Sequence, residues 1–253
     1  MEKIKIKTQQ GYLSAAVHRP PEVSDKLAVL CPGFLDSKDY AHLVALAEML
    51  CERGYTAVRF DPTGTWESSG NSADYDTTQY LEDVKTVIDH MYTESEYAHI
   101  LLGGHSRGGR IAILYGARDP RISLALGIMP SHGYPGGPGR EQWEKTGIKI
   151  SQRDLPANDK EYREFQLPFS HVLDLDKYDT LSEAGKIKVP VILIAGELDE
   201  LIPPEDVKIL FDSIKGVKKM VIVPSIGHDY RRNEKEIKIV NDSIAKELDS
   251  LKL

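Results

Sequence analysis

The chain has 253 residues, of which 41% are hydrophobic and 28% are charged, as expected for one globular domain with a substantial core. Its formal net charge of −7 argues against a surface that binds nucleic acid. Cys31 and Cys51 are too few for a disulfide framework and do not form a metal-binding pair. The N-terminus has no secretory h-region and no apolar run reaches membrane-spanning length, so we expect a cytoplasmic protein without a membrane partner.

Short apolar runs alternate with amphipathic segments along most of the chain. Residues 3–8 and 12–18 predict an antiparallel hairpin at a sheet edge. The other strands are expected at 27–31, 56–60, 98–102, 124–129, 191–195 and 219–223, and the helices at 43–50, 80–91, 110–115, 206–214 and from 234 onward. Strands that alternate with helices favour parallel βαβ units. We therefore expect an α/β fold with a mostly parallel central sheet flanked by helices on both faces.

The alternation stops between about Pro130 and Thr180, where glycine, proline, aromatic and charged residues are frequent. A structureless loop of this length is unusual inside a compact domain, so the segment is predicted to be a functional insertion. The chain shows neither an internal repeat nor a low-complexity linker. We therefore expect a single domain over 1–253 with an insertion at about 130–180.

A nucleophile-elbow pattern, Gly104-x-Ser106-x-Gly108, follows the strand expected at 98–102. In an elbow, the serine occupies a sharp turn between a strand and a helix, so that its Oγ stands clear of the sheet. The turn is so tight that side chains two residues before and after the serine would collide, which explains the two glycines. The predicted flanking strand and helix give the motif its required setting, so Ser106 is the candidate nucleophile.

A serine hydroxyl needs a base, and the base needs a partner that orients it. In this architecture the two partners follow the serine in the order acid, then histidine. Asp199 stands just after the strand 191–195, and His228 just after the strand 219–223, where open α/β sheets gather their active sites. We predict His228 as general base and then acid, with Asp199 holding the imidazole tautomer.

Three other residues compete for these roles. Glu197 is the alternative acid, although it lies closer to its strand and should point differently. His105 adjoins the serine and is expected to pack beneath the elbow. His171 precedes Asp199 and lies in the insertion, so it does not fit the expected order.

An oxyanion hole needs two backbone N–H donors. One is expected from Arg107, the residue after the nucleophile, at the positive end of its helix. The other is expected from the loop after the strand 27–31, where Gly33-Phe34 stands. We predict Phe34 as the second donor, with Gly33 giving the backbone its freedom. The alternative for this loop is an ordinary turn.

Four of these motifs, with one further loop, make the sequence resemble the α/β-hydrolase superfamily, from Leu27 to the final helix. They are Pro32-Gly33-Phe34 as the oxyanion loop, Gly104-His105-Ser106-Arg107-Gly108-Gly109 as the elbow, Gly196-x-x-Asp199-x-x-Ile202-Pro203 as the acid loop, Gly227-His228 as the base loop, and Asp61-x-x-Gly64-x-x-x-Ser68-x-Gly70 as the loop after the fourth strand. Many members have histidine where Pro32 stands. The donor is a backbone group, so this departure affects only loop geometry.

The resemblance implies a cap, or lid, inserted after the sixth strand at about 130–180. In size this cap is similar to that of small bacterial carboxylesterases of the cinnamoyl and feruloyl esterase type. The resemblance also implies a serine esterase that forms an acyl-enzyme on small to medium acyl or aromatic esters. Three rivals stay open: a peptidase or amidase, an acyltransferase or thioesterase, and a non-catalytic ligand-binding protein.

The cap is expected to supply the pocket wall. The candidate substrate-binding residues are Trp143, Tyr162 and Phe169 from the cap and Trp66 from the loop after the fourth strand. The alternative for each is that it only packs the cap against the core. Three cap arginines could bind a carboxylate, but a solvated charged face is favoured for them: Arg140, Arg153 and Arg163.

The remaining expectations concern cofactors and partners. The sequence has no His-x-x-x-His pair and no clustered cysteine. The glycine-rich run 133–139 lacks the Gly-Lys-Ser/Thr ending of a phosphate loop. We therefore expect no metal, no cofactor and no nucleic acid. The expected partner is a small ester substrate, and a homodimer is left open.

Overall fold

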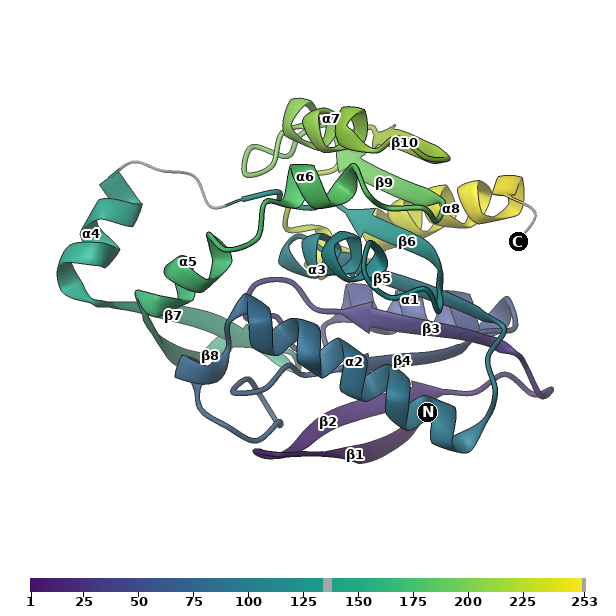
Figure 1. Cartoon of the computed structure of the whole chain (residues 1–253), viewed down its shortest axis with the longest axis horizontal. Coiled ribbons are helices and arrows are strands. Elements are labelled where there is room, and N and C mark those ends of the chain that lie inside the picture. Colours follow the sequence, from purple (N-terminus) through teal and green to yellow (C-terminus); the bar gives the residue numbers. More distant parts are fainter. Residues whose placement is uncertain (134–137, 252–253) are drawn as a thin grey trace.

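The computed structural model describes residues 1–133 and 138–251. An eight-stranded sheet lies between two sets of helices, and a separate two-stranded hairpin lies at one end of the molecule (Figure 1). The strands are β1 Glu2–Thr8, β2 Gly11–His18, β3 Lys26–Cys31, β4 Thr56–Phe60, β5 His99–His105, β6 Ile122–Ile128, β7 Ile148–Leu155, β8 Asn158–Pro168, β9 Val191–Gly196 and β10 Lys218–Val223. The helices are α1 Ala41–Glu52, α2 Thr77–Glu94, α3 Arg107–Gly116, α4 Pro138–Thr146, α5 Ser170–Leu175, α6 Thr180–Ala184, α7 Pro204–Ser213 and α8 Glu234–Leu251, with 3₁₀ turns η1 Ser72–Asp74 and η2 Tyr230–Arg232.

The central sheet has the strand order β1-β2-β4-β3-β5-β6-β9-β10. Strand β2 pairs antiparallel with β1 and β4. The neighbours in the rest of the sheet, β4, β3, β5, β6, β9 and β10 in that order, pair in parallel. The predicted edge hairpin and the mostly parallel sheet are therefore confirmed. All eight strands of this sheet were expected from the sequence, within a few residues at their ends.

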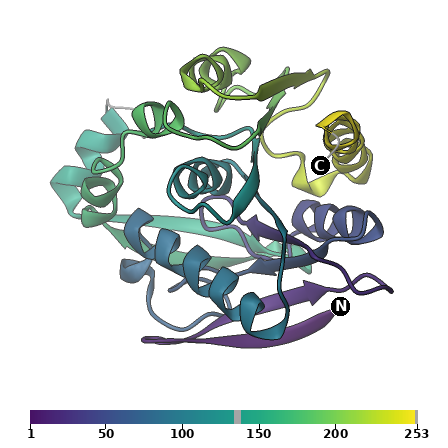
Figure 2. The ribbon, with the colours of Figure 1, turned by 45° about the vertical axis from the view of Figure 1, so that its right-hand side comes forward.

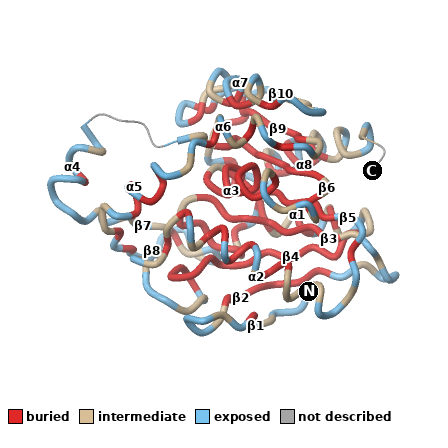
Figure 3. Tube along the Cα trace, viewed as in Figure 1, coloured by how far each residue is buried: buried red, intermediate tan, exposed pale blue. Residues whose placement is uncertain are grey.

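The helices cover both faces of the sheet (Figure 2). Successive residues of a strand point to opposite faces, and β3 shows this directly: Ala28 and Leu30 join the core beneath α1 and α8, while Leu27 and Val29 join the core beneath α2 and α3. A third cluster fills the space between α3, α6, α7 and β9. The central strands β3 to β6 are consequently buried along most of their length (Figure 3).

The segment between β6 and α6 leaves the sheet and forms α4, the β7–β8 hairpin and α5 (Figure 1). It follows the sixth strand, where the resemblance places a cap. The sequence did not predict β7 and β8, because the eleven residues of β8 are mostly polar and exposed and lack the apolar alternation of a half-buried strand. We call residues 138–175 the cap. Its standing as a functional insertion of one domain stays a prediction.

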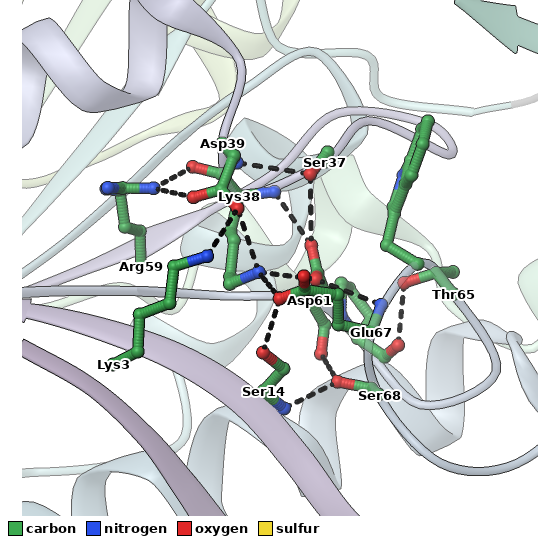
Figure 4. Close-up of polar contacts among 12 residues, drawn as sticks. Lys3, Ser14, Ser37, Lys38, Asp39, Arg59, Asp61, Thr65, Glu67 and Ser68 are labelled. Atoms are coloured by element: carbon green, nitrogen blue, oxygen red, sulfur yellow. Dashed lines mark hydrogen bonds and ion pairs between the residues drawn. The ribbon is translucent and has the colours of Figure 1, made fainter. Parts of the chain in front are cut away.

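A buried ion pair fastens the loop after β3 to the loop after β4 (Figure 4). Nζ of Lys38 lies 3.0 Å from Oδ2 of Asp61, and both side chains are fully buried. Asp61 also accepts the backbone N–H of Lys38 at 2.8 Å, and the half-exposed Glu67 carboxylate lies 2.6 Å from the same Nζ. Buried Arg59 donates to the Lys38 carbonyl at 2.5 Å. These contacts fix the course of residues 33–39, which form one side of the candidate site.

Within the described ranges, no helix is both long enough and apolar enough to cross a lipid bilayer. The compartment of the protein stays a prediction.

Candidate active site

Ser106 occupies the turn between β5 and α3, with φ 53° and ψ −117°. A positive φ is rare for a residue with a side chain and marks backbone strain. The flanking glycines make this turn sterically feasible, because a Cβ on Gly108 would lie 2.0 Å from the carbonyl oxygen of Cys31, and one on Gly104 would lie 2.5 Å from the same atom. Hence β3, β5 and α3 approach more closely here than any side chain would allow.

His228 and Asp199 complete a hydrogen-bonded path from the serine. Nε2 of His228 lies 3.0 Å from Oγ of Ser106, and Nδ1 lies 2.7 Å from Oδ2 of Asp199. The fully buried Asp199 carboxylate accepts through its other oxygen the backbone N–H groups of Leu201 and Ile202 at 2.9 and 2.8 Å. A carboxylate on Nδ1 places the ring proton there, so Nε2 is the acceptor for the serine hydroxyl.

The topology explains how residues so distant in sequence meet. Ser106 follows β5, Asp199 follows β9 and His228 follows β10, and all three strands run parallel. Their carboxyl ends therefore lie along one edge of the sheet. The structure brings together the three residues predicted as a triad.

The competing residues are engaged elsewhere. Glu197 accepts the backbone N–H of Ser225 at 2.9 Å rather than a ring nitrogen of His228. His105 is buried beneath the elbow, as expected. His171 is also buried, and its Nδ1 donates to the carbonyl of Tyr75 at 2.6 Å.

The loop after β3 and the start of α3 carry the two predicted oxyanion donors, Phe34 and Arg107. Leu35 has φ 58°; its N–H donates to the hydroxyl of Tyr75, which donates in turn to the carbonyl of Gly33. No hydrogen bond from the Phe34 N–H occurs within the described residues. Arg107 is the first residue of α3, where N–H groups have no intrahelical acceptor. Both N–H groups are thus available to a ligand, and their role as an oxyanion hole is part of our proposal.

A cavity of about 880 Å³ opens over Ser106. Its wall includes Phe34, Arg107, Arg153 and His228. Arg153 comes from the cap and donates through Nε and Nη2 to the carbonyl of Phe34, at 3.0 and 2.7 Å. Sequence reasoning favoured a solvated face for Arg153. In the structure, alternate residues of β7 from Lys149 to Arg153 are less exposed, so one face of this strand is covered and Arg153 stands on it.

The four aromatic candidates are absent from the described wall of this cavity. Trp143 is buried against His171 and donates to the carbonyl of Leu167; Phe169 packs against Trp143. Trp66 is buried too, packs on Phe165 and donates to the carbonyl of Leu35. Tyr162 is 60% exposed on β8. Trp66 therefore joins the core to the cap through Phe165, whereas Trp143 and Phe169 contact other cap residues and, with Trp66, belong to or pack against one hydrophobic core.

Asp36, His42 and His105 form a buried cluster behind His228. One ligand-type atom from each lies within 4.8 Å of the others, and the rings of His105 and His228 are 4.8 Å apart. Burial, reinforced by the neighbouring His105, lowers the pKa of His42 to about 3. Burial would raise the pKa of Asp36, but the ring of His105, 3.8 Å away, and nearby positive charges outweigh it and hold that pKa well below its usual range.

This cluster is the one group within the described ranges whose residue types suit a metal ion. Asp36 already pairs with Arg231 at 3.2 Å, so a cation bound there would meet a guanidinium. The cluster spans three separate elements, and no local spacing in the sequence indicated it.

Sequence comparisons relate the chain to known hydrolases. The profile of the serine aminopeptidase S33 family matches residues 22–142. The mouse mitochondrial palmitoyl-protein thioesterase ABHD10 is 25% identical over 215 residues, which cover 82% of this chain and 69% of that protein.

Two solved structures extend the comparison over nearly the whole chain. Est1E from Butyrivibrio proteoclasticus, solved with ferulic acid, has a TM-score of 0.78 at 22% identity and covers 97% of both chains. The α/β-hydrolase GrgF from Penicillium has a TM-score of 0.83 at 20% identity, covering 99% of this chain and 97% of that one. Taken with the profile match, these similarities show that the chain has the α/β-hydrolase fold and resembles serine hydrolases of that superfamily.

Proposed function

We propose that this chain is a carboxylic ester hydrolase that forms an acyl-enzyme on Ser106. The observation that carries the proposal is the hydrogen-bonded path from Oγ of Ser106 through both ring nitrogens of His228 to Asp199. A serine hydroxyl is a weak nucleophile until a base accepts its proton. Here that base is within reach and is held in the accepting tautomer.

In the proposed reaction, Oγ of Ser106 attacks the ester carbonyl while Nε2 of His228 accepts the hydroxyl proton. The negative oxygen of the tetrahedral intermediate accepts hydrogen bonds from the N–H groups of Phe34 and Arg107. Asp199 stabilises the imidazolium that forms. The imidazolium then protonates the leaving alcohol, and water, deprotonated by the same ring, releases the acid from Ser106.

The proposed substrates are small to medium acyl or aromatic esters. The cavity over Ser106 has a volume of about 880 Å³, within the ~300–1,000 Å³ of typical small-molecule sites. Est1E, the structural relative, was solved with an aromatic acid bound. Both observations support a substrate with one acyl or aromatic group of modest size.

Thioester hydrolysis is the second candidate function. The observation that favours it is the match to a curated palmitoyl-protein thioesterase over 82% of this chain. A thioester would form the same acyl-enzyme, and its thiol, with a pKa of about 8.5, leaves more readily than an alcohol.

The test is a hydrolysis panel with wild type and Ser106→Ala. The substrates are 4-nitrophenyl acetate, butyrate and octanoate, methyl ferulate, butyryl- and palmitoyl-coenzyme A, and a leucine 4-nitroanilide. We expect turnover of the oxygen esters by wild type and none by Ser106→Ala. A thioester preferred over its matched oxygen ester would replace the first candidate with the second. Hydrolysis of the anilide alone would indicate a peptidase, and transfer to an added alcohol in preference to water an acyltransferase.

A further inference from the structure

Three cationic side chains surround the ring of Phe34, beside the proposed oxyanion hole. The guanidinium carbons of Arg107 and Arg153 each lie 5.9 Å from the centre of this ring, and Nζ of Lys149 lies 6.0 Å from it. Arg107 comes from α3, whereas Lys149 and Arg153 stand on the same face of β7 in the cap. Core and cap thus direct positive charge at one place in the cavity.

The charge of Arg107 is not balanced by a carboxylate. Its side chain is 5% exposed, and its Nη1 donates to Nε2 of His171 at 2.9 Å. His171 is neutral, because burial and the charge of Arg107 lower its pKa to about 3. The ring of Tyr75 lies 4.1 Å from the guanidinium, and Nε and Nη2 of Arg107 have no hydrogen-bond partner, carboxylate or other, among the described residues. A buried cation without a counter-charge is costly unless an anion joins it.

The carboxylates on the cavity wall are mostly engaged. Asp36 and Asp229 lie 3.2 and 2.6 Å from Arg231, and Asp36 also lies 4.0 Å from Arg153. The other carboxylate on the described wall is Asp206, in the first turn of α7. Against these three carboxylates stand five cations of the same described wall: Arg107, Arg110, Lys149, Arg153 and Arg231. The cavity is therefore positive although the whole chain carries a formal charge of −7.

Arg110 adds charge one helical turn beyond Ser106. It is 1% exposed, and among the described residues it donates only to neutral oxygens, those of Thr180, Leu175 and Tyr178. Burial lowers its pKa to about 10, so it stays positive at neutral pH.

We propose that the substrate carries an anionic group, such as a carboxylate, within a few bonds of the scissile carbonyl, and that this group binds among Arg107, Lys149 and Arg153. The inference rests on the proposed ester hydrolysis and names its substrate class. The separation of the anionic group from the scissile carbonyl is short because both contact Phe34. The N–H of Phe34 is the proposed donor to the carbonyl oxygen, and the three cations lie around its ring. The anion belongs either to the acyl part or to the leaving group, and the experiment separates the two.

The experiment compares matched charged and neutral esters. The acyl arm pairs mono(4-nitrophenyl) glutarate with 4-nitrophenyl valerate, which differ at the far end of the chain. The leaving-group arm pairs 4-(butyryloxy)benzoate with its methyl ester. Each kcat/KM is divided by the rate of uncatalysed hydrolysis. In at least one arm we expect the charged ester to be favoured about tenfold, and less so in 0.5 M NaCl, because salt screens exposed charges.

Variants locate the anion. Lys149→Met and Arg153→Met should each lower the charged-to-neutral ratio about fivefold, whatever they do to turnover of the neutral ester. Lys160→Met removes the same charge from an exposed position at the start of β8 and should leave the ratio unchanged. A neutral ester that equals or exceeds its charged partner in both arms overturns the inference. So does a preference that survives both cavity variants.

A binding measurement keeps this inference separate from the proposed reaction. Calorimetric titration of Ser106→Ala with the glutarate and valerate esters needs no turnover, as does titration with the two benzoate derivatives. Tighter binding of a charged member, with no ester hydrolysed by wild type, would reject ester hydrolysis and retain the anion site. Equal binding in both pairs would reject the anion site alone if wild type hydrolyses the neutral esters.

Discussion

Nε2 of His228 lies 3.0 Å from Oγ of Ser106, although 122 residues separate them in the chain. If this contact transfers the serine proton, Ser106→Ala and His228→Ala should each lower kcat on 4-nitrophenyl butyrate by about 10⁵- to 10⁶-fold, since such residues act as a unit. Thermal unfolding should show that both variants stay folded. A fall of only a few-fold for His228→Ala would reject His228 as the base.

The acid is tested by a matched pair of variants. Asp199→Asn should lower kcat by about 10³- to 10⁴-fold, less than loss of the serine, because an amide disturbs the tautomer of His228 but leaves the ring in place. Glu197→Gln changes an exposed carboxylate that bonds a backbone N–H, and should leave kcat nearly unchanged. If steady-state assays show a larger loss of kcat for Glu197→Gln than for Asp199→Asn, Glu197 is the acid that orients His228.

The buried pair of Lys38 and Asp61 should be coupled in stability. Lys38→Met leaves the buried Asp61 carboxylate without its main counter-charge, which should cost about 3–5 kcal/mol of unfolding free energy. Adding Asp61→Asn should recover part of that loss, since no unpaired charge is then buried. Urea denaturation of both single variants and the double variant measures the coupling, and additive effects would contradict it. Lys85→Met, which breaks an exposed pair on α2, is the control and should change little.

Buried histidines should make the fold sensitive to acid. His42 has a pKa of about 3 in the fold against about 6.5 when unfolded, so the unfolded chain binds more protons between these values. Stability is then complete above pH 6.5 and is lost as pH falls, by about 2 kcal/mol at pH 5 from His42 alone.

His42→Phe should remove this dependence, because neither ring nitrogen of His42 has a hydrogen-bond partner among the described residues. The measurement is the midpoint of urea unfolding at each pH from 7.5 to 4.5, and the slope of this midpoint against pH is compared between variants. His99→Phe alters an exposed histidine and should keep the wild-type slope. Equal slopes for wild type and His42→Phe would contradict the account.

The elbow should not tolerate a methyl group. A Cβ on Gly108 would lie 2.0 Å from the carbonyl oxygen of Cys31, so Gly108→Ala must push β3 and α3 apart and should cost about 3 kcal/mol or more. Gly139→Ala, where a Cβ meets nothing within 4 Å, is the control. Thermal unfolding measures the stability of both variants. A Gly108→Ala protein as stable as wild type would contradict the close approach of α3 to the Cys31 carbonyl.

Local patterns were sufficient for the central sheet and for selecting the three residues that form the hydrogen-bonded path from Ser106 through His228 to Asp199. The strands of a mostly buried sheet are apolar runs, and residues at their carboxyl ends meet because the strands are parallel, so order along the chain was enough to select Asp199 and His228. The cap behaves differently. Its long strand β8 is largely exposed on both faces, so no apolar period marks it.

The residues that line the cavity could not be predicted from local sequence patterns either. Trp66 and Trp143 were chosen for their aromatic character, yet whether a ring faces a cavity or the core depends on the elements packed around it. Arg153 was assigned to a solvated face, whereas β7 folds back over the loop after β3 and brings it to Phe34. Such contacts depend on how the cap docks, and no spacing in the chain records that.

The cap is joined to both sides of the candidate site. Arg153 holds the carbonyl of Phe34, while the neighbouring Asp154 lies 2.9 Å from Arg231, three residues beyond His228. Exchanging this hairpin for that of a relative would thus change the contacts that hold the loops of Phe34 and His228, as well as the lining of the cavity. A chimera that lacks these two anchors should lose activity even with an intact serine, histidine and aspartate, so cap and core have to be recombined as one unit when the enzyme is re-engineered.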